Sequence, residues 1–161
     1  MKKTLVLIFF LAYLYPLQGL ASTRSAKIVS VRPNAFVLFE NERENASVAD
    51  QVNQGETLQT GTSGRISLLL PDHMLLKIAS ETIFVYDPST DNKNSGVLKK
   101  GKVWLRGHKK GQDFKIKTPS ATTAIRGTEW YIEVDENETT TIGVMDGIVE
   151  VANDFGKVIL Q

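Results

Sequence analysis

The sequence predicts an all-β protein, and three observations support this class. From residue 22 onward, apolar and polar residues alternate with a period of two in one segment after another, so each extended segment offers one apolar face. Clusters of Gly, Pro, Asn and Asp separate these segments and are typical of turns. No segment past residue 21 keeps a helical period. We expect short, mostly antiparallel strands stacked in a solenoid- or roll-like arrangement, with a two-sheet β-sandwich as the alternative.

The first 21 residues are predicted to be a secretory signal peptide. Lys2 and Lys3 supply a positive start, residues 4–17 form an apolar run without charge, and small residues within 19–21 suit cleavage at the end of this segment. The apolar run is shorter than the roughly 20 residues that a membrane helix needs; retention as an uncleaved anchor is the alternative. Cleavage leaves residues 22–161, enough for a single all-β domain with its own core and no stable membrane span.

Five segments show the alternation most clearly. Their apolar positions, which we expect to point inward, are Ile66, Leu68 and Leu70; Met74, Leu76 and Ile78; Val103 and Leu105; Phe114 and Ile116; and Trp130, Ile132 and Val134. Turn signals between segments occur at 32–34, 61–64, 71–72, 87–96, 108–111, 135–137 and 146–147. Residues 157–161 end the sequence inside an apparent strand, which leaves an edge open to association with another strand.

The charge balance gives no strong pull toward any one class of partner. The chain has 19 Lys and Arg against 18 Asp and Glu, and removal of a leader with two lysines leaves 17 against 18, a net charge of −1. Binding to nucleic acid through bulk charge is therefore not expected. The chain has no cysteine, which excludes disulfides and thiolate metal sites.

Two blocks of small and turn-forming residues resemble the FecR domain, an exported all-β module of bacteria. The first block is GETLQTG at 55–61 followed by Gly64-Arg65 and Pro71-Asp72, and the second runs from Thr118-Pro119 through Arg126-Gly127-Thr128 to Asp146-Gly147. The resemblance covers roughly residues 50–152. The motif residues, to which we assign structural roles, are Gly55, Thr60, Gly61, Arg65, Asp72, Gly101, Thr118, Pro119, Arg126, Gly127, Thr128 and Gly147.

The resemblance implies a role in binding or signalling and names no reaction. The best-known members of this family span the inner membrane, control a sigma factor through a cytoplasmic segment, and meet an outer-membrane receptor on the periplasmic side. Here only three residues precede the apolar run, too few for such a cytoplasmic segment. We therefore expect a periplasmic or secreted FecR-domain protein and not a full-length transmembrane regulator. An envelope signalling component related to sigma-factor regulation is the alternative.

Residues suited to catalysis are scarce, so no enzyme activity, cofactor or metal is expected. His73 and His108 are the two histidines of the chain, and no HxH, HExxH or GxSxG spacing occurs. The segment from Gly96 to Val103 resembles a phosphate-binding loop but has Val103 in place of the hydroxyl residue and leads into a strand.

A basic stretch at 99–117 provides the candidate ligand face. It contains eight Lys and Arg residues and one acid, Asp113. Period-two alternation places the side chains of Lys102, Trp104, Arg106, Lys115 and Lys117 on the outer sides of two strands, which would form one patch if these strands were neighbours. Such a patch suits an anionic envelope polysaccharide, while the alternative is a solvated face whose cations pair with acids at 129–138. Recognition of another envelope protein, with strand addition at an exposed edge as one mode of binding, is the other predicted function.

Overall fold

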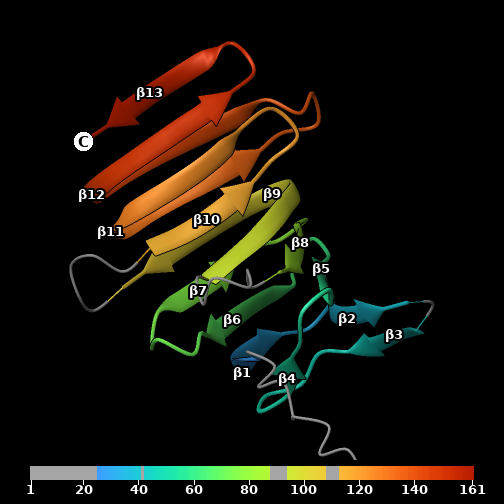
Figure 1. Ribbon diagram of the computed structural model, residues 1–161. Helices are drawn as coiled ribbons and strands as arrows, with labels where there is room; N and C mark the ends of the chain where they lie inside the picture. The colour runs from blue at the N-terminus through green and yellow to red at the C-terminus, as the bar shows by residue number, and fades with distance from the viewer. Residues whose placement is uncertain (1–24, 41, 88–93, 108–112) are drawn as a thin grey trace, which may run out of the picture.

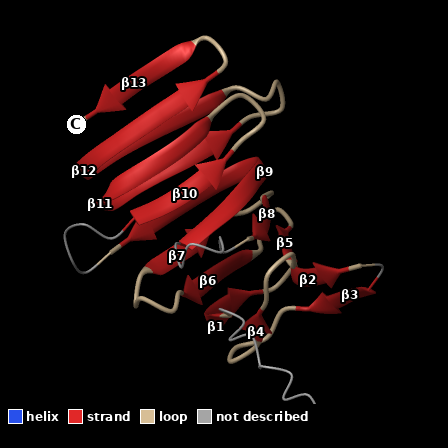
Figure 2. Ribbon diagram, in the orientation of Figure 1, coloured by secondary structure: helices blue, strands red, loops and turns tan. Residues whose placement is uncertain are grey.

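The computed structural model describes residues 25–40, 42–87, 94–107 and 113–161, and within these ranges it contains strands and no helix (Figures 1 and 2). The predicted signal peptide at 1–21 and the turn at 108–111 therefore lie outside the described residues, as does most of the turn at 87–96. The described part contains no helix that is long and apolar enough to cross a membrane. The strands are β1 (Ala26–Arg32), β2 (Ala35–Phe39), β3 (Glu42–Asn45), β4 (Gln51–Val52), β5 (Thr57–Thr60), β6 (Arg65–Leu69), β7 (Leu75–Ile78), β8 (Ile83–Tyr86), β9 (Asn94–Arg106), β10 (Asp113–Lys117), β11 (Thr122–Val134), β12 (Thr140–Asn153) and β13 (Gly156–Leu160).

Hydrogen bonds join all the strands into one sheet. Its longest path runs β13-β12-β11-β10-β9-β7-β6-β1-β4, and β8, β5, β2 and β3 branch from β9 in that order. All pairs are antiparallel except β9 with β10. The predicted all-β class is therefore confirmed. One continuous sheet confirms neither the solenoid-like arrangement nor the sandwich of two separate sheets.

The sheet bends within β9, near its middle. Before the bend the buried residues are even-numbered, namely Gly96 and Leu98. After the bend they are odd-numbered, namely Val103 and Leu105. Gly101 lies between them with φ of +90°, a conformation that favours glycine. The first half of β9 pairs with β8 and β10, and the second half pairs with β7 and β11.

In the long strands β11 and β12, the alternation of buried and exposed positions also shifts by one residue partway along the strand. In β11 the buried positions move from Thr123 and Ile125 to Trp130, and the pairing register shifts just after Gly127. Gly127 lies directly opposite Gly147 of β12, which has φ of +120°. Bulges of this kind bend a strand and turn its side chains to the other side.

These bends fold the sheet over a core that lies between two layers. Phe114 of β10 contacts Trp130 of β11 with 5.8 Å between ring centroids, although the two residues are not opposite each other in the strand pairing. The largest fully buried side chains include Trp130, Tyr86, Phe84, Phe114, Ile28, Leu58, Ile66, Leu68, Met74, Leu76, Ile78 and Leu98. The inward positions predicted from the alternation are all buried.

Candidate functional site

Trp104 projects from the outer face of β9, on the side away from the core. Its neighbours Val103 and Leu105 are completely buried, while Trp104 is partly exposed. Lys77 of β7 and Tyr131 of β11 lie directly opposite it on either side, so the three side chains form a row across three strands. We call the surface formed by Arg65, Lys77, Lys102, Trp104 and Tyr131 the Trp104 face.

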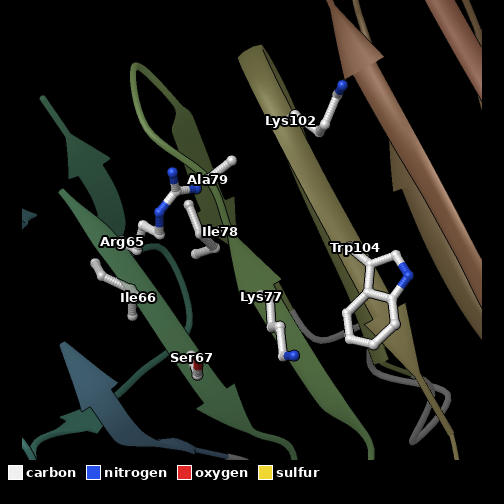
Figure 3. A pocket seen from close by; sticks show the side chains of 8 residues that line it. All are labelled: Arg65, Ile66, Ser67, Lys77, Ile78, Ala79, Lys102 and Trp104. Carbon is white, nitrogen blue, oxygen red and sulfur yellow. The ribbon is translucent and has the colours of Figure 1, made fainter. Parts of the chain in front are cut away.

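Cations lie over both aromatic rings of this row. The Lys77 Nζ is 4.4 Å from the centroid of the Trp104 ring, and the Lys102 Nζ is 5.5 Å from that of Tyr131. Figure 3 shows Lys77 and Trp104 on adjacent strands with their side chains close together. Such contacts orient the rings and keep positive charge close to the apolar surface.

A glycine on the neighbouring strand makes room for the Tyr131 ring. Gly143 of β12 lies opposite Tyr131, and a Cβ at position 143 would come within 2.0 Å of the Tyr131 Cε1 atom. The Tyr131 ring therefore packs against the backbone of Gly143, so that the row of Lys77, Trp104 and Tyr131 reaches a fourth strand, β12.

Beside Trp104 the surface is hollowed over β6, β7 and β9. The hollow has a volume of about 360 Å³ and is shallow. Figure 3 shows the residues that line it: Arg65, Ile66, Ser67, Lys77, Ile78, Ala79, Lys102 and Trp104. Three of these carry positive charge and none is acidic; Lys102 is paired with Glu133, so Arg65 and Lys77 are the cations with which the hollow would hold an anionic group.

Two acidic residues of β11 lie opposite basic residues of the ligand face predicted from the sequence. Lys102 forms an ion pair of 2.6 Å with Glu133, and both side chains are nearly half exposed. Arg106 lies opposite Glu129 in the strand pairing. The alternative interpretation, in which cations pair across the ladder, therefore applies to Lys102.

A second ion pair lies at the bend of β9. The Lys100 Nζ is 2.9 Å from Glu136 Oε1, and both groups are in solvent. The hydrogen bond and the charge of Glu136 raise the pKa of Lys100, and the same two effects of Lys100 lower the pKa of Glu136. Because solvent screens the pair, it contributes little to stability.

The structure does not place Lys115 and Lys117 next to Trp104. Both are exposed on β10, opposite Ser95 and Val97 in the first half of β9. The inward residue Phe114 of β10 reaches across the core to Trp130, so β10 and the Trp104 face belong to different layers. Lys115 and Lys117 therefore lie beside a part of β9 that is several residues before Trp104, and the structure does not join them with Trp104 in one patch.

Other cations take the place of these two lysines. Lys77 and Arg65 lie on the Trp104 face, and Arg32 of β1 lies directly opposite Arg65. Neither Lys77 nor Arg32 was among the residues of the predicted ligand face, and Arg65, to which a structural role was assigned, is exposed on this face. The alternation did place Lys77 outward between Leu76 and Ile78, but the periodicity contains no signal for which strand lies beside β9.

Several motif residues pack the corner where β5, β8 and β9 meet. The buried Thr60 hydroxyl donates a hydrogen bond to the Ala79 carbonyl at 2.6 Å and accepts one from the Thr82 N–H at 3.0 Å. The Thr82 hydroxyl accepts a hydrogen bond from the Lys102 N–H at 3.0 Å. Gly101 lies against Thr82, where a Cβ would approach its Oγ1 to 2.3 Å. Thr60 and Gly101 thus take part in the packing of this corner, as does Thr82, which was not among the predicted motif residues.

The second motif block joins β10, β11 and β12. The buried Thr118 hydroxyl accepts hydrogen bonds from the Ala121 N–H at 3.1 Å and the Thr140 hydroxyl at 2.8 Å, next to the exposed Pro119. Arg126 is exposed and its Nε lies 3.6 Å from Asp113 Oδ1.

The remaining motif residues lie in turns and at bends. The N–H of Gly55, which has φ of +87°, donates to the Tyr86 carbonyl at 2.8 Å, and that of Gly61 donates to the Asn34 carbonyl at 2.8 Å. Asp72 lies in the turn before β7. Gly127 and Thr128 lie at the register shift of β11, and Gly147 lies opposite Gly127.

No group of three or more His, Asp or Glu side chains that could hold a metal ion occurs in the described ranges.

A second notable surface is the open end of the sheet at β12 and β13. Residues Val149–Asn153 of β12 pair with β13, whereas Thr140–Val144 pair with β11 alone among the described strands, and Met145 follows them at a register shift. Several large apolar side chains are exposed around this end: Met145 at 50%, Ile148 at 45%, Phe155 at 98%, Val158 at 57% and Ile159 at 58%.

Comparison with known proteins identifies the family. The family model described as FecR protein matches residues 56–150, more than half of the chain. No curated protein and no solved structure matches the chain. The match agrees with the two motif blocks and with the all-β fold, and FecR proteins are envelope-associated proteins with signalling and regulatory roles. This chain belongs to the FecR protein family.

Proposed function

We propose that the chain is an exported, non-catalytic binding module of the bacterial cell envelope, and that it recognises another envelope protein by accepting a β-strand from it. The observation that carries this proposal is the open edge of β12 along Thr140–Met145, where the sheet has backbone groups on one side without a strand partner in the described part of the chain. An exposed strand edge is a template for pairing with another chain.

Apolar side chains next to this edge favour an ordered partner strand over solvent. Ile142 and Val144 of β12 point toward the core and are only partly buried, as are Val151 and Leu160 in the layer that contains β13. A strand added beside Thr140–Met145 would extend the layer and cover this end of the core. Main-chain hydrogen bonds would supply affinity, and alternate side chains entering the space between the layers would supply specificity.

Family membership supports the choice of partner. The FecR family has signalling and regulatory roles in the envelope, and such a role requires contact with another protein. A signalling pathway related to sigma-factor regulation would use this contact to report the state of an outer-membrane partner. The domain then acts by binding, which agrees with the scarcity of residues suited to catalysis.

Export is part of the proposal and has a direct test. We expect the mature protein to begin at Ser22 and to occur in the periplasmic or secreted fraction, because residues 1–21 have the order of charge, apolar run and small residues of a signal peptide. N-terminal sequencing of the fractionated protein measures this. Recovery of an intact Met1 in the inner-membrane fraction would contradict it.

Hydrogen exchange with and without envelope extract tests strand addition. We expect those amides of Thr140–Met145 that point away from β11 to become protected when the partner binds, because an added strand supplies acceptors along this edge. The double variant Met145→Lys/Val158→Lys should abolish this protection and the capture of the partner. Both residues are at least half exposed, so the variant should fold.

A matched control lies at the other end of the sheet. Phe39 of β2 and Val48, which follows β3, are also at least half exposed, and Figure 1 shows the β2–β3 hairpin far from β13. Phe39→Lys/Val48→Lys adds the same two charges and should leave the partner interaction unchanged. Protection that appears elsewhere, or equal loss in both double variants, would overturn strand addition at β12.

A further inference from the structure

We propose that the Trp104 face, together with Arg32, binds an extended anionic glycan. The proposal concerns a different face from the open edge of β12 and does not depend on strand addition there. Trp104 and Tyr131 would stack on sugar rings, and Arg32, Arg65 and Lys77 would bind the carboxylate or phosphate groups of the glycan.

The first observation is a pair of opposed arginines. Arg32 of β1 and Arg65 of β6 lie directly opposite each other and are both exposed. Like charges at directly opposed positions destabilise a strand pair. Among the ion pairs of the described residues, none includes Arg32, Arg65 or Lys77. An anion between the two guanidinium groups would remove this repulsion and accept hydrogen bonds from both.

The second observation is the row of aromatic side chains beside these cations. Trp104 and Tyr131 are partly exposed neighbours on the outer face, and Gly143 provides the flat surface against which Tyr131 lies. An aromatic ring held at the surface presents a rigid apolar plane at little entropic cost. The apolar side of a sugar ring fits such a plane, while Lys77 can turn from the Trp104 ring toward a charged substituent.

The third observation is the shape of the site. The hollow beside Trp104 is shallow and crosses three strands, and Arg32 extends the row of cations to β1. With neighbouring strands roughly 4.8 Å apart, the distance from β1 to β9 is roughly 14 Å. A small molecule would find little enclosure on such a surface, whereas a polymer lying across the strands would contact the arginines and the aromatic rings together.

The exposed residues argue against a lipid bilayer as the ligand. In the described ranges, the large hydrophobic side chains with high exposure lie on β1, β2, β12 and β13 and in loops, and none lies on β6, β7, β9 or β11. The Trp104 face therefore lacks apolar side chains that could insert into a membrane. An acidic peptide would satisfy the cations but would leave the paired aromatic planes without a matching partner.

Binding of the purified protein to three immobilised polymers tests the proposal. Alginate has sugar rings with carboxylates, poly-L-glutamate has carboxylates without sugar rings, and dextran has sugar rings without charge. We expect binding to alginate at least about tenfold tighter than to either of the others, weakening with added salt because the cations are exposed. Phosphorylated dextran distinguishes phosphate from carboxylate as the preferred anion. Equal binding to poly-L-glutamate would overturn the glycan and indicate an acidic peptide.

Variants within and outside the Trp104 face locate the site. Trp104→Ala should weaken alginate binding about fivefold to tenfold, in line with the loss of an aromatic contact, and Arg65→Glu/Lys77→Glu should abolish it. Lys115→Glu/Lys117→Glu makes the same change in net charge on β10, outside the Trp104 face, and should have no effect. Thermal melting of each variant establishes that it is folded. If both double-glutamate variants lose binding equally, or if Trp104→Ala binds like the wild type, the Trp104 face is not the site.

Discussion

Gly101 is the residue on which the bend of β9 depends most directly. Its φ is +90°, and a Cβ there would approach the Thr82 Cα to 2.6 Å and the Glu81 carbonyl oxygen to 2.7 Å. Both contacts are with backbone atoms, which a rotamer change cannot move. Gly101→Ala should therefore lower the free energy of unfolding by roughly 2–4 kcal/mol, from backbone strain and overpacking together.

The matched control for this prediction is Gly55. It also has a positive φ, of +87°, but a Cβ would meet only Phe39 Cε2 at 3.9 Å. Gly55→Ala should therefore cost about 1 kcal/mol, from the backbone conformation alone. Chemical denaturation of both variants measures the difference. Equal losses would show that the contact with Thr82 relaxes.

The exposed pair of Lys100 and Glu136 leads to a prediction about pH. Because Lys100 holds the pKa of Glu136 below its ordinary value of 4.5, the small stabilisation from Glu136 is present above that value and is lost as the pH falls through the lowered pKa. Lys100→Met should raise the pKa of Glu136, because it removes the hydrogen bond and the charge that lower this pKa; NMR titration of the side-chain carboxyl measures the change. An unchanged pKa would contradict the ion pair.

At the scale of elements, the pairing of β1 with β6 creates the repulsion between Arg32 and Arg65. Removing one charge should relieve it, so Arg65→Thr should raise the free energy of unfolding by roughly 0.2–1 kcal/mol. Lys77→Thr is the control, because Lys77 lies opposite Ser67 and Trp104 and has no opposed cation. Lower stability of Arg65→Thr than of the wild type in urea denaturation would contradict the repulsion. Without this repulsion, the opposed pair of Arg32 and Arg65 would no longer favour an anion between the two guanidinium groups.

The strand alternation could be predicted at this scale, and the neighbours of each strand could not. Period-two alternation correctly placed Val103 and Leu105 inward and Trp104 outward. Trp104 lies beside Lys77, 27 residues earlier, and beside Tyr131, 27 residues later. These pairings depend on long-range contacts, which the alternation within one strand does not encode.

At the scale of the whole molecule, the core is closed at its centre and open at the β12–β13 end. β9 pairs with strands on both sides in each of its two halves, whereas β13 is an edge strand with four of its five residues exposed. Local opening of β13 therefore exposes little additional apolar surface. We expect the amides of Lys157–Leu160 to exchange faster than those of Val103–Leu105 by at least about a hundredfold, measured by native-state hydrogen exchange. Similar rates would indicate that β13 opens only with the whole sheet.

The sequence by itself determined the all-β class, the inward and outward side of the clearest strands, and membership of the FecR family through its two motif blocks. These properties are local, because period-two alternation and turn residues act within a few positions of the chain. Only the tertiary structure decided that Lys115 and Lys117 lie beside the first half of β9, away from Trp104, and that Arg65 and Lys77 lie on the face of Trp104, with Arg32 next to Arg65. The physical reason is the bend at Gly101, where β9 leaves one layer and enters the other. A strand that changes layer exchanges all its neighbours, and which residues become the new neighbours depends on how distant parts of the chain pack against the core.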